Sequence, residues 1–202
     1  MIARAIQNGG VIAFRTDTFY GLGADPFDCA AVQRIKELKG REDNQPILIV
    51  ISDRDQVGRF IEAPSNSFQL LGEEFWPGAL TLIGNAHPEI AAEITAGTGT
   101  VGVRLPNDQR VRALVRACGG ALTATSANPS RQPPASSAQM VMSYFGEKLD
   151  LIVDDGDSRT DAPSTVVDAT REQPKLIREG VIPWSEIQNR ELSSSPSGRG
   201  AR

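Results

Sequence analysis

Short polar strings follow or interrupt the apolar runs of this sequence, and they carry the side chains best suited to chemistry. The string RTDTFYGLG, residues 15–23, places Thr16, Thr18 and Tyr20 among glycines. Hydroxyl groups beside glycines at the exit of a strand can form a cradle for a small ligand. A turn held by local side-chain hydrogen bonds is the alternative interpretation, and the string alone leaves both open.

Two basic sites could bind an anion. Lys39 and Arg41 flank Gly40 at the end of an expected helix, where an arginine fork and a lysine point charge would suit a polyphosphate. Basic residues at a helix C-terminus also complement the helix dipole, which is the simpler explanation for this pair. Arg104 lies in the apolar string TVGVRLP, so its charge needs either an acidic partner or an anionic ligand.

Further hydroxyl, amide and guanidinium groups stand next to expected strands. Ser126 and Asn128 follow one strand and can cap a helix or hold a phosphate or sugar. Ser164 precedes another strand, and Arg178 lies in the string LIREG. Neither a Walker-type glycine-lysine loop nor a GxGxxG motif occurs, so arginine, lysine and hydroxyl side chains would have to hold any phosphate.

The pattern of apolar residues predicts the elements that position these side chains. Asp28 can cap a helix whose apolar stripe includes Val32 and Ile35, and Gly40 can end it. Interleaved strands and helices indicate a single α/β domain with a twisted sheet flanked by helices. Several successive strands leave no room for a crossover helix, so the sheet should be mixed parallel and antiparallel. We expect helices near 1–8, 28–39, 53–61, 65–75, 108–118 and 136–144, and strands near 11–14, 46–51, 80–83, 101–105, 121–125, 151–153, 165–168 and 175–177.

Composition limits the class of protein. The 202 residues, 40% of them hydrophobic, suit one domain with one core, which we place at 1–192. The remaining residues 193–202, SSSPSGRGAR, are expected to form a disordered tail. No apolar run approaches the roughly 20 residues of a membrane span, and the N-terminus lacks a secretory segment, so we expect a cytoplasmic protein. The net charge of −4 argues against general nucleic-acid binding.

The thiols and the single histidine are not expected to do chemistry. Cys29 and Cys118 are far apart in the sequence and show neither metal-ligand nor disulfide spacing. We interpret both as buried, inert helix residues. His87 precedes a proline in an expected loop, so a catalytic role for it is not expected. The sequence therefore predicts no protein-held metal.

Taken in order, these strings resemble the YrdC/TsaC family of threonylcarbamoyl-AMP synthases. The resemblance covers the whole chain except the tail, and we expect the short form of the family, which lacks the extra C-terminal domain of longer members. The matching strings are RTDTFYGLG, Lys39-Gly40-Arg41, WPGALT, VGVRLP, Ser126-Ala127-Asn128, Ser164-Thr165 and Arg178-Glu179-Gly180.

The resemblance implies the YrdC-like fold and a nucleotidyltransferase activity. Its substrates would be L-threonine, bicarbonate or CO2, and ATP with Mg2+, and a separate tRNA threonylcarbamoyl transferase complex would use the product. Lys39 and Arg41 would be catalytic. The ATP contacts would be Lys39, Arg41, Thr100, Ser126, Asn128 and Arg178; the threonine contacts Thr16, Arg104 and Ser164; and Thr18 and Tyr20 further pocket residues.

The sequence departs from the family pattern at several positions, and other functions stay open. Arg15 replaces a proline, Asp17 a glutamate, Glu42 a proline and Pro163 an acidic residue. An RNA-binding module is one alternative, although the acidic charge and the 5% aromatic content count against it. A carbamoyl-adenylate activity like that of hydrogenase-maturation proteins, and a catalytically degenerate family member, are the others.

Overall fold

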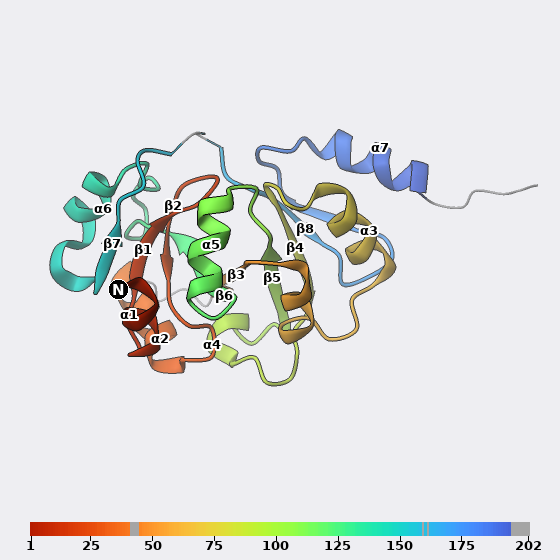
Figure 1. The fold of residues 1–202 in the computed structure, drawn as a ribbon. Coiled ribbons are helices and arrows are strands. Elements are labelled where there is room, and N and C mark those ends of the chain that lie inside the picture. The colour runs from red at the N-terminus through yellow and green to blue at the C-terminus, as the bar shows by residue number, and fades with distance from the viewer. Residues whose placement is uncertain (41–44, 159, 161, 195–202) are drawn as a thin grey trace, which may run out of the picture.

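A nine-stranded mixed sheet forms the centre of the molecule (Figure 1). The computed structural model describes residues 1–40, 45–158, 160 and 162–194. The strands lie in the order β7-β1-β2-β6-β3-β5-β4-β8-β9. Their bounds are β1 Ile12–Arg15, β2 Tyr20–Gly23, β3 Leu48–Ile51, β4 Leu80–Asn85, β5 Thr100–Arg104, β6 Ala121–Ser126, β7 Leu151–Val153, β8 Thr165–Asp168 and β9 Lys175–Arg178.

The strand pairing confirms the expected mixed sheet. Strand β1 pairs in parallel with β7, β3 with β5, and β4 with β8. The other five pairs are antiparallel. Short connections join the antiparallel pairs β1–β2 and β8–β9, whereas the segments that join the strands of each parallel pair are long and contain helices.

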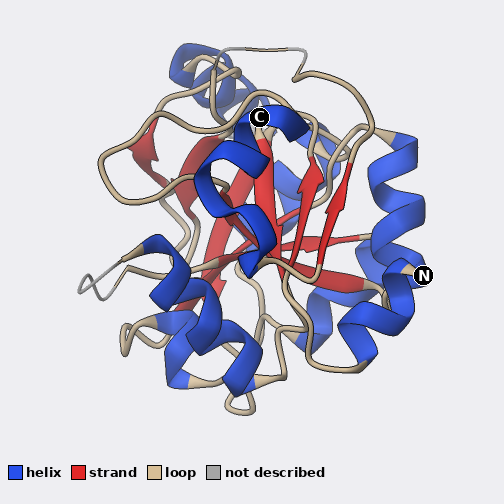
Figure 2. Ribbon diagram, turned by 90° about the vertical axis from the view of Figure 1, so that its left-hand side faces the viewer, coloured by secondary structure: helices blue, strands red, loops and turns tan. Residues whose placement is uncertain are grey.

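Helices cover both faces of the sheet (Figures 1 and 2). One core cluster joins α1 and α5 to alternate strand residues such as Val50 and Leu122. The larger cluster joins residues of α2, α3, α4, α6 and α7 to the opposite face, where Ile49 and Ile51 point. The helices are α1 Ile2–Gln7, α2 Cys29–Lys39, α3 Asn66–Phe75, α4 Ala92–Thr95, α5 Gln109–Ala117, α6 Ala138–Phe145 and α7 Trp184–Ser194, with the 3₁₀ turns η1 Arg54–Arg59 and η2 Gly146–Lys148.

Helix α2 begins and ends where its capping residues predict. The Asp28 carboxylate accepts a hydrogen bond from the backbone N–H of Ala31, which would otherwise lack a partner at the first turn. Gly40 follows the helix with φ +63°, a left-handed conformation that glycine adopts without steric cost. Asp108 caps α5 in the same way, through the N–H groups of Arg110 and Val111.

The structure corrects several sequence-based expectations about elements. Residues 20–23 of the expected polar loop form β2, because pairing with β1 and β6 satisfies their backbone groups. The expected helix near 53–61 is the 3₁₀ turn η1, and neither α4 nor α7 was expected. Helix α7 continues through Ser194, so the first two residues of the expected disordered tail are helical. Residues 195–202 lie outside the described residues.

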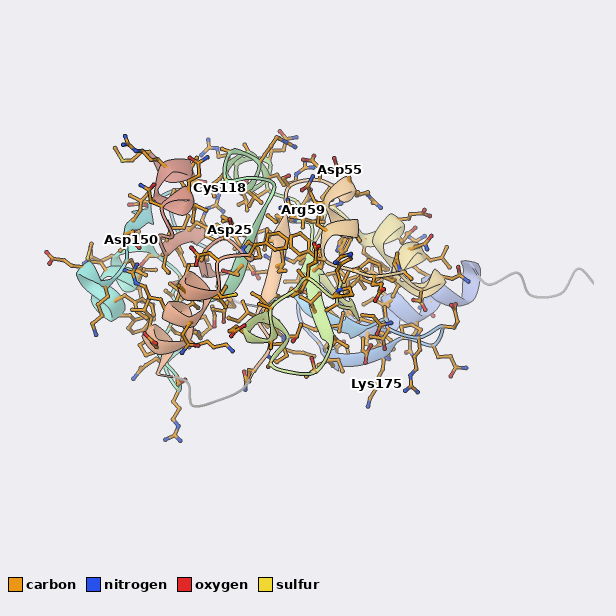
Figure 3. All side chains as sticks on the ribbon, turned by 90° about the horizontal axis from the view of Figure 1, so that it is seen from below. Asp25, Asp55, Arg59, Cys118, Asp150 and Lys175 are labelled. Carbon is orange, nitrogen blue, oxygen red and sulfur yellow. The ribbon has the colours of Figure 1, made fainter. Side chains whose placement is uncertain are left out.

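The cysteines differ from each other in exposure. Cys118 is buried, and burial raises the pKa of its thiol. Figure 3 shows it at the end of α5. Cys29 begins α2 and is exposed, so the expectation that both thiols are buried was wrong for Cys29. A residue in the first turn of a helix can face solvent even when the rest of the helix packs on the sheet.

No helix within the described part of the chain has the length and apolar character required to cross a membrane.

Candidate functional site

A cavity of about 840 Å³ opens on the α5 face of the sheet. Alternate residues of the central strands, among them Leu48, Gly102 and Ala124, form its floor. Helix α5 covers another part of the same face through Val111 and Val115. Seven residues predicted from the sequence line this cavity: Thr16, Thr18, Tyr20, Arg104, Ser126, Ser164 and Arg178.

Arg104 is the buried cation of the cavity. It ends β5, and its side chain is 4% exposed. Its Nη2 donates a hydrogen bond to the Asp17 carboxylate, and its Nη1 donates to Thr18 Oγ1 at 3.3 Å. Burial lowers the pKa of Arg104, and the Asp17 charge opposes that shift. The sequence left open whether Arg104 pairs with an acidic residue or with an anionic ligand. In the structure it has an acidic partner, Asp17, and it also lines a cavity that could hold a ligand.

The turn between β1 and β2 presents two hydroxyl groups to the cavity. Thr16 Oγ1 donates to the Phe19 carbonyl at 2.7 Å and accepts a hydrogen bond from the Thr18 backbone N–H at 3.1 Å. The two threonine hydroxyl oxygens lie 3.1 Å apart. The local hydrogen bonds confirm the turn interpretation of this string, and the same bonds fix the two hydroxyls that line the cavity, whereas ligand binding by this cradle stays a prediction.

Tyr20 joins the cavity wall to the connection between β7 and β8. Its hydroxyl donates to the Gly156 carbonyl at 2.8 Å, and burial raises the pKa of the phenol. Arg15 fixes the same connection: its Nη2 lies 2.8 Å from Asp108 Oδ2 and 2.9 Å from Asp155 Oδ2. The arginine that replaces the family's proline is therefore a buried structural ion-pair residue outside the cavity lining.

A second group of polar residues lines the opposite side of the cavity. Thr81 Oγ1 and Ser164 Oγ lie 2.9 Å apart and are buried. Arg178 Nη2 donates to the Ser164 carbonyl at 3.0 Å. Partial burial lowers the pKa of Arg178, and repulsion from Arg104 lowers it further. Sequence reasoning missed Thr81 as a site residue, although it is the threonine of the WPGALT string.

Lys39 is not among the residues that line the cavity. This fully buried side chain donates from Nζ to the backbone carbonyls of Ser126 and Asn128. Weaker contacts of 3.4 Å reach Ser126 Oγ and Asn128 Oδ1. The Asn128 amide itself donates to the carbonyls of Pro129 and Gln132. Lysine 39 therefore fixes the loop that presents Ser126 to the cavity.

Three described residues among the predicted nucleotide contacts, Lys39, Thr100 and Asn128, do not line the cavity. Thr100 begins β5, at the opposite end of the strand from Arg104, and its hydroxyl lies 2.9 Å from Thr98 Oγ1. It is not among the cavity residues. Arg41 and Glu42 lie outside the described residues, so the structure describes the Lys39–Arg41 motif only at Lys39 and Gly40.

The charge of the cavity suits an anionic ligand. The guanidinium groups of Arg104 and Arg178 line the cavity, and the Asp17 carboxylate, which pairs with Arg104, is not among the lining residues. The hydroxyls of Thr16, Thr18 and Ser164 supply donors and acceptors beside them. Among the residues that the structure describes, no partner contacts the buried Arg104 Nε. An unpaired buried donor is costly, and a ligand oxygen would satisfy it.

A family model for Sua5/YciO/YrdC proteins, described as "Telomere recombination", matches residues 4–180. The chain belongs to this family. The match confirms the family resemblance predicted from the sequence strings, and the sheet with its flanking helices confirms the expected YrdC-like fold. Every cavity residue that the sequence predicted lies within the matched range.

Relatives in the Sua5/YciO/YrdC family agree with this assignment. The chain is 37% identical over 183 residues to the threonylcarbamoyl-AMP synthase of Pyrococcus abyssi, and the aligned region covers 91% of this chain and 54% of that protein. It is 35% identical over 187 residues to the threonylcarbamoyl-AMP synthase of Bacillus subtilis, covering 92% and 54%. The chain thus spans about half the length of these curated relatives.

A solved structure in the same family has a closely similar fold. The crystal structure of Pyrococcus abyssi Sua5 complexed with L-threonine matches with a TM-score of 0.89 at 37% identity. The match covers 93% of this chain and 55% of that chain. The relative was therefore solved with an amino acid bound, and the corresponding domain fold is shared.

Proposed function

We propose that this protein is a threonylcarbamoyl-AMP synthase, which forms L-threonylcarbamoyladenylate and pyrophosphate from L-threonine, bicarbonate or CO2, and ATP. The observation that supports the proposal most strongly is the cavity, which is lined by the guanidinium groups of Arg104 and Arg178 together with the hydroxyls of Thr16 and Ser164. The names of the relatives and the L-threonine bound to one of them support the same reaction.

The cavity can hold L-threonine through groups of matching chemistry. The Arg104 guanidinium suits the threonine carboxylate because arginine forms charge-assisted hydrogen bonds with carboxylates. The hydroxyls of Thr16 and Ser164 can bind the polar groups of the amino acid. Thr18 and Tyr20 complete this part of the wall. Burial strengthens these electrostatic contacts because water does not screen them.

We assign ATP to the side of the cavity at Ser126. Arg178 lines the same cavity, and Lys39 with Asn128 lies directly behind Ser126. Arg41 and Thr100 remain predicted nucleotide contacts. Mg2+ would enter bound to the ATP phosphates, where it offsets their charge. The described residues offer no group of three or more histidine, cysteine, aspartate or glutamate residues that could hold a metal, so we assign its ligands to the phosphates.

The reaction would need mainly positioning and charge stabilisation. The threonine amine attacks CO2 to give a carbamate and releases a proton. A carbamate oxygen then attacks the α-phosphorus of ATP, and pyrophosphate leaves with the electrons of the broken P–O bond. Holding the reactants together can supply about 7–11 kcal/mol of the barrier reduction. Cations beside the phosphates stabilise the developing charge without a histidine base.

The adenylate product is a reactive mixed anhydride, and a separate enzyme must use it. We propose that this consumer is a tRNA threonylcarbamoyl transferase complex that modifies tRNA in the cytoplasm. Weak RNA binding by this chain belongs to the same proposal, since product transfer would occur near tRNA.

Pyrophosphate release from ATP tests the function. The wild-type protein should release pyrophosphate only with both L-threonine and bicarbonate present. Arg104→Lys keeps the charge but loses the fork, so the KM for L-threonine should rise about 10- to 100-fold, as expected for charged hydrogen bonds. Arg116→Lys is the matched control, because Arg116 forms an exposed ion pair with Asp53 and lies outside the cavity.

No threonine-dependent release from the folded wild-type protein would contradict the proposal. Salt-dependent RNA affinity without ATP turnover would then favour the RNA-binding alternative. Failure to bind ATP, L-threonine and RNA would favour a degenerate family member. Release supported by carbamoyl phosphate in place of L-threonine would favour the carbamoyl-adenylate alternative.

A further inference from the structure

Asp17 is the carboxylate partner of the buried Arg104 and belongs to none of the predicted contacts. It lies between the cavity residues Thr16 and Thr18, but it does not line the cavity itself. Its side chain is 13% exposed. Oδ1 accepts the hydrogen bond from Arg104 Nη2, and Oδ2 lies 3.4 Å from the Asn107 backbone N–H. Asp17 is therefore placed to act on a ligand through Arg104.

The hydrogen bonds of Arg104 leave one donor of its guanidinium without a partner among the described residues. Asp17 engages Nη2 and Thr18 engages Nη1. Within the described part of the chain, Nε is buried without a partner. An arginine has five N–H donors, so one carboxylate already bound does not exhaust them. A ligand carboxylate can thus bind the same guanidinium that Asp17 holds.

Asp17 also sets the charge that a ligand meets. Arg104 and Arg178 are close enough to repel each other, and Asp17 offsets one of these two charges. A bare carboxylate entering the cavity is attracted by the arginines but repelled by Asp17. An amino acid carries in addition an ammonium group, which the Asp17 carboxylate attracts. The resident carboxylate therefore penalises simple anions more than it penalises zwitterions.

We propose that Asp17 is a specificity-determining residue, which makes the cavity select an amino acid over the corresponding carboxylate that lacks the α-amine. This inference rests on the proposed function for the identity of L-threonine as the amino acid. Its physical basis, the Asp17–Arg104 pair beside an unfilled guanidinium donor, does not depend on turnover.

The test compares the binding of two ligands by calorimetry in the absence of ATP. L-Threonine is the zwitterion, and 3-hydroxybutyrate is the same skeleton without the α-amine. In Asp17→Asn the preference for L-threonine over 3-hydroxybutyrate should fall about tenfold or more, because the negative charge beside Arg104 is lost in a poorly screened site. Asp17→Glu should restore the preference, since it restores the charge.

The ratio of the two affinities distinguishes this role from a structural one. If Asp17 had only a structural role, its replacement would weaken the binding of both ligands equally and leave the ratio of their affinities unchanged. Asp108→Asn is the matched control, because it removes a carboxylate beside the buried Arg15 while an asparagine can still cap α5. Its ratio should equal that of the wild type. If Asp17→Asn does not fold, Asp17→Ser supplies a second neutral variant in which the same fall is expected.

A ratio within twofold of wild type in the folded neutral variants would overturn the inference, as would an equal fall in Asp108→Asn. The same experiments distinguish failure of this inference from failure of the proposed function. If the ratio falls as expected but wild type shows no threonine-dependent pyrophosphate release, the inference stands as amino-acid selectivity and the synthase proposal fails. If pyrophosphate release is threonine-dependent and the ratio is unchanged, the inference alone fails.

Discussion

At the scale of single residues, the cations of this site do different work. Arg104 faces the cavity from a buried position and has the Asp17 carboxylate beside it. Arg178 reaches the same cavity from the edge strand β9, whose first residue, Lys175, is exposed (Figure 3). Lys39 instead donates its hydrogen bonds to backbone carbonyls behind Ser126. Charge near a cavity therefore does not by itself identify a ligand contact.

Replacing Lys39 tests how far its role is structural. Lys39→Ala leaves the buried carbonyls of Ser126 and Asn128 without this donor. We expect the free energy of unfolding to fall by about 1–3 kcal/mol and pyrophosphate release to fall, because the Ser126 loop loses its support. Urea denaturation and initial rates at saturating ATP measure the two effects.

Lys36→Ala, a substitution on the same helix and outside the cavity lining, is the control and should change both quantities little. Equal unfolding free energies for Lys39→Ala and wild type, with a loss of ATP affinity only, would instead place the ammonium in direct contact with phosphate.

At the scale of elements, the floor of the cavity depends on small residues in the central strands. A Cβ atom at Gly102 of β5 would lie 3.1 Å from Thr81 Cγ2 on the neighbouring strand β4. The register places Gly102 opposite Ile83, so its missing side chain leaves the space above the floor open. Glycine is costly within a strand, and this position is explained by the cavity that it lines.

Filling this space should impair binding more than folding. In Gly102→Val the added methyl groups enter the cavity beside Thr81, so the KM for L-threonine should rise by about tenfold or more, because one extra methylene in a binding pocket changes binding by about 1–3 kcal/mol. Kinetics with L-threonine as the varied substrate measure the effect. Gly58→Ala is the control, because a Cβ at Gly58 meets no atom within 4 Å. An unchanged KM in folded Gly102→Val would contradict a ligand at this floor.

At the scale of the whole molecule, buried Arg15 joins three distant segments. It lies on β1 and pairs with Asp108 before α5 and with Asp155 after β7. The Arg15 hydrogen bond lowers the pKa of Asp155, with burial opposing and Arg110 adding to the shift. Burial raises the pKa of Asp108, but hydrogen bonds from Arg15 and two backbone N–H groups outweigh it, so the net shift is downward.

These shifts predict how stability depends on pH. The folded carboxylates bind protons less readily than the unfolded chain, whose aspartates titrate near about pH 3.9. Their contribution is present above that pKa and is lost as the pH falls through the lower pKa values of the folded state. Asp155→Asn should therefore be less stable than wild type near neutral pH and lose less stability between about pH 5 and 3. Urea denaturation across this pH range measures the free energy of unfolding of both proteins. If the two free energies fell in parallel as the pH is lowered, the role of Asp155 would be contradicted.

Much of the fold follows from the sequence by itself. The limits of α2 and α5 depend on Asp28, Gly40 and Asp108, whose capping hydrogen bonds involve residues at most four positions away. The apolar strand runs were also recognised, since burial on both faces requires continuous apolar sequence. The ordered polar strings identified the family and seven of the cavity residues.

Only the tertiary structure decided which residues that are distant in the sequence contact one another. Strand β2 exists because β1 and β6 pair with it, and nothing local distinguishes it from a loop. Arg104 finds its carboxylate 87 residues away, and Lys39 finds its carbonyl partners at separations of 87 and 89 residues. Contacts between side chains so distant depend on strand order and register, which local sequence patterns do not specify. For that reason the sequence could require a partner for Arg104 but could not identify it as Asp17.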